Sequence, residues 1–128
     1  MTEQRQAILE LVANCGLPVH EIAAGDKLFL KGDAAGCMYV VMSGTVEVLM
    51  YGRILERVGK GGIVGEMALI DGNARCAAAL TGEATKLIAI DRAAFLDLVR
   101  REPQFALAVL DVMARRLRAM NARVADAL

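Results

Sequence analysis

The sequence predicts an α+β fold: an antiparallel β-roll, of the jelly-roll or cupin-like kind, with a short helix before it and two helices after it. Three observations support this prediction. Short apolar runs of strand length fill residues 17–90, and several are rich in β-branched residues. All but one of the 12 glycines lie between residues 25 and 82, where they separate these runs. Apolar residues at helical spacing occur before and after this segment.

With 128 residues, the chain has the length of one ordinary domain, expected to cover residues 1–128. The first helix is expected within residues 1–16 and should end near Gly16 and Pro18. Its helically spaced apolar residues are Ala7, Ile8, Leu11 and Val12.

The β-roll is expected over residues 17–90. Its predicted strands are residues 27–30, 38–42, 45–50, 53–58 and 86–90. Tight hairpin turns are predicted at Ser43-Gly44 and Tyr51-Gly52, because a glycine interrupts two strand-like runs at each place.

Two helices are expected over residues 91–128. Asp91 can cap the first, and Pro103 both stops it and suits the first turn of the second. The second helix carries two apolar stripes. Phe105, Val109 and Val112 form one stripe, which is expected to pack on the β-roll.

The other stripe on this helix has the spacing that joins two helices, so it predicts a homodimer. Its residues are Leu110, Met113, Leu117, Met120 and Val124. The alternative is a single wide stripe with the remaining positions exposed to solvent.

Composition narrows the function. Acidic and basic residues number 15 each, which argues against a strongly basic protein that binds nucleic acid or membrane surfaces. A secretory leader and a membrane-spanning run are not expected. The three cysteines lack the spacing of a zinc site and His20 is the only histidine, so we expect reduced thiols, no metal and a cytoplasmic location. Catalysis is not expected either, because no arrangement of a nucleophile with histidine or of paired carboxylates stands out.

Residues 61–78 contain the candidate binding residues. A short helix beginning near Glu66 would point free N–H groups towards an anion, and Arg75 could bind phosphate oxygens. Glu66 would repel phosphate but could accept a hydrogen bond from a sugar hydroxyl. Together these residues indicate a nucleotide site, although a surface Glu–Arg pair flanking a turn explains the spacing equally well.

The stretch GEMALIDGNARCA, residues 65–77, closely resembles the phosphate-binding cassette of cyclic nucleotide-binding domains. These domains occur in catabolite activator proteins, protein kinase A regulatory subunits and cyclic nucleotide-gated channels. The pairs Gly32-Asp33 and Ser43-Gly44 also resemble the family's early β-roll, and the two C-terminal helices resemble its B and C helices.

The resemblance implies roles for individual residues. Glu66 would bind the ribose 2′-hydroxyl and Arg75 the cyclic phosphate. Other cassette residues would line the same site, several through their backbone: Gly65, Met67, Ala68, Cys76 and Ala77. Relatives have Ala, Ser or Thr at the position of Cys76, and Thr there is associated with guanine. A thiol is a poor hydrogen-bond donor, so cAMP is favoured and cGMP stays possible.

The C helix covers the base in many relatives. In this chain Arg116 continues the roll-facing stripe and could stack on a purine. The alternative is that Arg116 belongs to a solvated cluster with Arg115 and Arg118. Val64, with Val58 or Ile63, is expected to line the base pocket.

The resemblance therefore implies a regulatory module in which cAMP moves the last helix and signals to an unknown effector protein. The alternatives are the N-terminal sensor of a catabolite-activator-type transcription factor, the sensor of a channel, or a roll that binds proteins instead of a nucleotide. A helix-turn-helix domain would need about 60–80 more residues, so this chain alone is not expected to bind nucleic acid.

Overall fold

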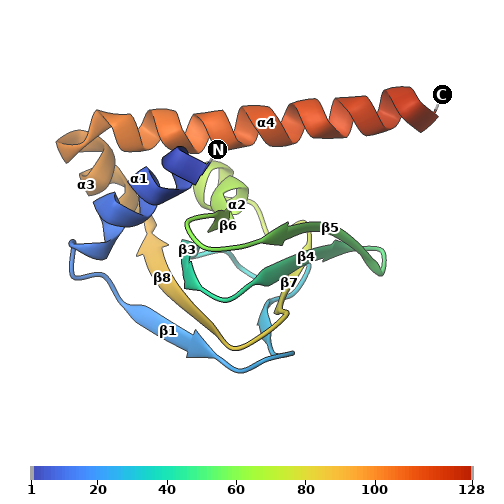
Figure 1. Cartoon of the computed structure of the whole chain (residues 1–128), viewed down its shortest axis with the longest axis horizontal. Helices are drawn as coiled ribbons and strands as arrows, with labels where there is room; N and C mark the ends of the chain where they lie inside the picture. The colour runs from blue at the N-terminus through green and yellow to red at the C-terminus, as the bar shows by residue number, and fades with distance from the viewer. Residues whose placement is uncertain (1, 128) are drawn as a thin grey trace.

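The chain forms a β-roll of two four-stranded antiparallel sheets, with one long helix lying across it (Figure 1). The computed structural model describes residues 2–127, so residues 1 and 128 of the expected domain lie outside the described chain. The elements are α1 (Thr2–Ala13), β1 (Val19–Ile22), β2 (Lys27–Phe29), β3 (Cys37–Ser43), β4 (Val46–Met50), β5 (Arg53–Val58), β6 (Ile63–Val64), α2 (Glu66–Asp71), β7 (Ala78–Thr81), β8 (Thr85–Asp91), α3 (Arg92–Arg101) and α4 (Pro103–Ala127). The predicted fold class is confirmed.

The strand orders are β1-β8-β3-β6 in one sheet and β2-β7-β4-β5 in the other. Adjacent residues of a strand point to opposite faces, so β3 serves two cores. Val41 joins an apolar cluster to which both sheets contribute. Val40 joins a second cluster, which the helices α1, α3 and α4 cover with Ile8, Leu98 and Phe105. This second core fixes the position of α4 relative to the β-roll.

The two predicted hairpin turns have different outcomes. Tyr51 and Gly52, with φ of 53° and 75°, connect the paired strands β4 and β5, so this turn is confirmed. The prediction at Ser43-Gly44 is wrong, because β3 and β4 belong to different sheets and the chain crosses between them there. Gly44 has a φ of 91°, and a Cβ on it would lie 2.6 Å from the carbonyl oxygen of Ala84. Two successive strand-like runs give the same pattern whether they pair or change sheets.

Three strands were not among those predicted. The four residues of β1 are mostly exposed, β6 has two residues, and β7 consists of small residues and one leucine. None of them carries the alternation of large apolar and polar residues on which the prediction depends.

The C-terminal helices follow the prediction closely. Asp91 caps α3, since its Oδ1 accepts a hydrogen bond from the N–H of Ala94 at 2.8 Å, and α4 begins at Pro103. Phe105 and Val109 are buried, whereas four residues of the predicted partner-facing stripe are 58–61% exposed. These four are Leu110, Leu117, Met120 and Val124; Met113 is partly buried against the core. None of the helices described is long and apolar enough to cross a membrane.

Candidate functional site

The predicted site forms around α2, a six-residue helix between β6 and β7. It begins after Gly65 and ends before Gly72, and both glycines have positive φ. One side of α2 is buried through Ala68 and Leu69, while Met67 is 53% exposed. The site therefore sits on a short helix held between two turns that need glycine.

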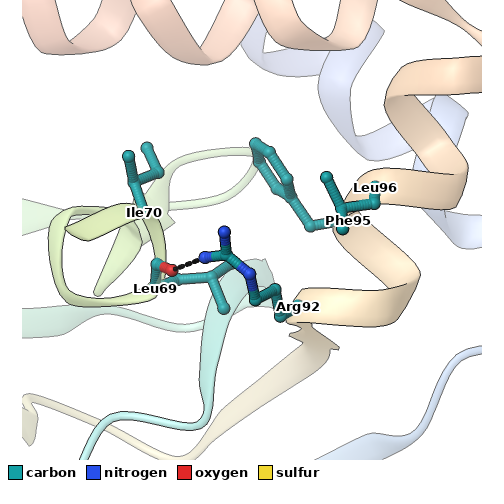
Figure 2. A pocket seen from close by; sticks show the side chains of 5 residues that line it. All are labelled: Leu69, Ile70, Arg92, Phe95 and Leu96. Atoms are coloured by element: carbon teal, nitrogen blue, oxygen red, sulfur yellow. Dashed lines mark hydrogen bonds between the residues drawn. The ribbon is translucent and has the colours of Figure 1, made fainter. Parts of the chain in front are cut away.

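A contact from α3 fixes the last turn of α2. Nη1 of Arg92, the first residue of α3, donates to the carbonyl oxygen of Leu69 at 3.0 Å (Figure 2). A small pocket lies between these helices, and Ile70, Phe95 and Leu96 also line it. Neither Glu66 nor Arg75 lines this pocket, so it is separate from the site predicted from the sequence.

Arg75 is buried, with 5% of its surface exposed, and backbone carbonyls hold its guanidinium. Nη1 donates to the oxygen of Gly65 at 2.9 Å, and Nη2 donates to the oxygen of Cys37 at 2.5 Å. Within residues 2–127, Nε has no hydrogen-bond partner and no carboxylate forms an ion pair with this side chain. A buried cation with an unsatisfied N–H and no counter-charge is suited to binding an anion.

The backbone of Arg75 is fixed by the loop between β2 and β3. The N–H of Gly32 donates to the oxygen of Arg75 at 2.8 Å, and the N–H of Arg75 donates to the oxygen of Asp33 at 2.9 Å. The Asp33 carboxylate in turn accepts from the N–H of Leu30 at 2.9 Å. The Asp33 carboxylate therefore stabilises its own loop, and the Asp33 backbone carbonyl holds the backbone of Arg75.

Gly65 allows the guanidinium of Arg75 to approach the start of α2. A Cβ on Gly65 would collide with Nη1 of Arg75, and the φ of 80° at Gly65 is strained for other residues. Arg75 donates to the carbonyl of Gly65, the residue directly before Glu66. This contact brings the two residues predicted to bind the nucleotide close together.

Glu66 is 3% exposed and is paired with Arg116 of α4. Nη1 of Arg116 donates to Oε1 of Glu66, and Nη2 donates to the carbonyl oxygen of Ile63 at 2.6 Å. On its other side, Nε of Arg116 lies 2.9 Å from Oε1 of Glu56 on β5. This arginine therefore connects α4 to β5, β6 and α2.

The charge on Arg116 is maintained by these neighbours. Burial works to lower the pKa of Arg116, but the carboxylates of Glu66 and Glu56 outweigh this effect and raise that pKa above its usual value. The ion pair thus balances the buried negative charge of Glu66 with a charge supplied by α4.

A tyrosine borders the other end of the site. Burial and a hydrogen bond with Cys37 raise the pKa of Tyr39 to about 12, although the nearby charge of Arg75 works to lower it. The phenol is therefore neutral near pH 7 and gives Arg75 no negative partner.

The remaining predicted residues divide by exposure. Val64 and Ala77 are buried, at 2% and 7%, whereas the side chains of Cys76 and Met67 are exposed. Contacts from Met67 to a ligand would therefore involve its backbone. Sequence reasoning did not find Glu56 or the carbonyl of Cys37, since both come from strands outside the cassette and no local pattern marks them.

A family model described as "Cyclic nucleotide-binding domain" matches residues 19–102. The chain is also 37% identical over 99 residues to "Cyclic AMP receptor protein" from Thermus thermophilus, an alignment that covers 73% of this chain and 46% of that protein. The chain spans about half the length of this relative and of two CRP-like regulators from Mycobacterium tuberculosis, and 21–40% of the length of other curated relatives.

Among solved structures, the Thermus thermophilus catabolite activator protein superposes with a TM-score of 0.78 at 31% identity, covering 97% of this chain and 58% of that one. A structure described as "A cyclic-GMP-dependent signalling pathway regulates bacterial phytopathogenesis" superposes with a TM-score of 0.66 at 28% identity, covering 98% of this chain and 95% of that one.

Proposed function

The chain belongs to the cyclic nucleotide-binding domain family, and on that premise we propose that it is a sensory domain for cAMP. The nucleotide binds between the cassette of residues 64–78 and α4. The observation that carries this proposal is the environment of Arg75, a buried cation that has carbonyl partners and an unpaired Nε but no carboxylate.

The phosphate group of the ligand meets Arg75 in this proposal. The carbonyls around Arg75 are uncharged, so a bound anion would supply the negative charge that neutralises the guanidinium. Its oxygens can accept a hydrogen bond from the unpaired Nε. The backbone of Gly65, Met67 and Ala68 and the residues after the arginine, Cys76 and Ala77, complete this end of the site. Ala77 is small enough to allow close approach.

The ribose hydroxyl meets Glu66, whose carboxylate can accept a hydrogen bond from it. Glu66 is already paired with Arg116, so the ligand hydroxyl enters a network that includes α4. A change in this network alters the contact that holds α4 to the β-roll. This supports a ligand-dependent movement of α4 as the output of the domain.

The base lies near Val64 and the segment of α4 around Arg116. The guanidinium of Arg116 already contacts Glu66, Glu56 and the carbonyl of Ile63, so we assign Arg116 to the ribose end of the site. Stacking on the purine would require that Arg116 leave these partners. The preference for cAMP over cGMP rests on Cys76, because an exposed thiol is a weak donor to guanine.

Titration calorimetry of the whole chain with cAMP and with cGMP tests this function. We expect saturable binding of both at one site per chain, with cAMP binding more tightly, and Cys76→Thr should improve cGMP relative to cAMP. If neither nucleotide gives heat or raises the unfolding temperature, the proposal is wrong.

We propose that a second copy of this chain binds the partner-facing stripe of α4, formed by Leu110, Met113, Leu117, Met120 and Val124. Four of its five residues are 58–61% exposed and recur at coiled-coil spacing. Sedimentation with and without cAMP should show a dimer that Leu117→Glu disrupts and that Leu96→Glu, at an exposed leucine on α3, does not. A monomer under both conditions contradicts the dimer.

The wider role depends on the protein to which this domain is coupled. The chain spans about half the length of the cyclic AMP receptor protein that it matches, and the effectors we consider are a DNA-binding domain and a channel.

A further inference from the structure

Phe29 lies at the end of β2, and its ring packs against the guanidinium of Arg75. The distance from Cζ of Arg75 to the ring centroid of Phe29 is 4.1 Å, well within the range of a cation–π interaction. Phe29 pairs with Ala79 of β7, and a Cβ on Gly65 would lie 3.4 Å from Cε2 of the ring. The ring, the guanidinium and the start of α2 therefore form one packed group.

The partners of Arg75 differ in kind from those of Arg116, which is paired with two carboxylates. Two carbonyls accept hydrogen bonds from the Nη atoms of Arg75, and its Cζ lies over the face of the aromatic ring. The carbonyls and the ring are uncharged, so they stabilise the cation without neutralising it. A carboxylate at the position of the ring would neutralise Arg75 and compete with an incoming anion.

We propose that Phe29 is a positioning residue that orients Arg75 for the ligand phosphate. Cζ of Arg75 lies over the ring while Nε has no partner among the described residues, so ring and phosphate can act on the arginine at the same time. This inference rests on the proposed function, which assigns the phosphate to Arg75. It adds a residue outside the cassette, on a strand of the second sheet, to those that determine affinity.

Graded fluorination of the ring provides the binding test. Fluorine withdraws charge from the ring face while nearly preserving its shape, so 4-fluoro-, difluoro- and trifluorophenylalanine at position 29 should lower cAMP affinity in steps. Phe29→Leu, which removes the ring, should lower it about 3- to 30-fold. The same fluorinated residues at Phe95, which packs on Phe105 instead, are the matched control and should leave affinity unchanged.

Equal affinity across the position 29 series overturns the inference, because the ring would then only fill space. Tighter binding with fluorination also overturns it, because the ring would then compete with the phosphate for Arg75. Unfolding temperatures identify a variant that fails to fold, and the fluorinated series keeps the question decidable if Phe29→Leu is one. Wild type that binds no nucleotide contradicts the proposed function rather than this inference.

A readout without nucleotide separates the two further. In ¹H–¹⁵N spectra, the Nε–H of Arg75, assigned by its loss in Arg75→Lys, should be shifted by the ring current of Phe29 and should broaden or move in Phe29→Leu. If this signal is the same in wild type and Phe29→Leu, the ring does not position the arginine and the inference is wrong.

Discussion

The two ends of the candidate site each bury one charge but compensate it differently. Arg75 is 5% exposed and has only uncharged partners, all of them within the β-roll and its loops. Glu66 is 3% exposed and is paired with a full positive charge from α4. The phosphate end is thus assembled by the roll alone, whereas the ribose end is assembled only when α4 lies against it.

This difference separates binding from signalling. An uncompensated buried charge is costly, so Arg75 gains most from a ligand that brings a negative charge. Glu66 is already compensated, so a ligand hydroxyl changes its network without changing its net charge. Affinity should therefore depend mainly on the phosphate end, and communication with α4 mainly on the ribose end.

Arg75→Ala tests the phosphate end and should have the largest effect. We expect cAMP affinity to fall by about 100-fold or more, because a buried charged hydrogen-bond partner is lost. The unfolding free energy measured without nucleotide should change by only about 1 kcal/mol, since removing an uncompensated buried cation offsets the lost hydrogen bonds. Calorimetry and urea denaturation measure the two quantities.

Arg57→Ala is the control for this variant, because Arg57 is an exposed arginine paired with Glu47 on the same sheet. A loss of affinity below about fivefold in Arg75→Ala, or an equal loss in the control, contradicts the assignment of phosphate to Arg75.

Glu66→Gln tests the ribose end and should have the next largest effect. The neutral amide accepts a weaker hydrogen bond, so affinity for cAMP should fall about 10-fold. The analogue 2′-deoxy-cAMP lacks the hydroxyl, so it should bind Glu66→Gln as well as it binds wild type. Calorimetry measures both affinities. If Glu66→Gln lowers the affinity for 2′-deoxy-cAMP as much as the affinity for cAMP, Glu66 does not recognise the hydroxyl.

Arg116→Ala breaks the connection between the ribose end and α4. Glu66 would remain buried without its cation, so the unfolding free energy should fall by about 2 kcal/mol, a value reduced from that of a fully buried pair because Arg116 is 24% exposed. Affinity for cAMP should fall by about fivefold, less than in Arg75→Ala. Arg118→Ala, an exposed arginine of the same helix, serves as the control. Unchanged affinity and stability in Arg116→Ala show that the contact is dispensable.

Glu56→Gln sharpens the comparison with the smallest expected effect. Glu56 shares Arg116 with Glu66, so neutralising Glu56 removes one of the two carboxylates that hold the arginine in place and makes its contact with Glu66 less well ordered. We expect cAMP affinity to fall about two- to threefold, with no change for 2′-deoxy-cAMP. A greater loss for the deoxy analogue than for cAMP rules out this sharing.

Much of the fold was predictable because its signals are local. The capping of α3 by Asp91, the start of α4 at Pro103 and the turn at Tyr51-Gly52 each depend on a few neighbouring residues. The crossing at Ser43-Gly44 was not predictable, because its sheet assignment depends on which distant strands β3 and β4 pair with. Phe29 and Glu56 carried no signal for the same reason.

The sequence by itself determined the cassette, the helices, five of the eight described strands and the family, because helix periodicity, turn residues and motif spacing are properties of nearby residues. The tertiary structure alone decided how the two buried charges are compensated. Arg75 meets the carbonyl of a residue 38 positions away, and Glu66 meets an arginine 50 positions away. Contacts over such separations depend on sheet register and on the packing of α4, so no local pattern specifies them.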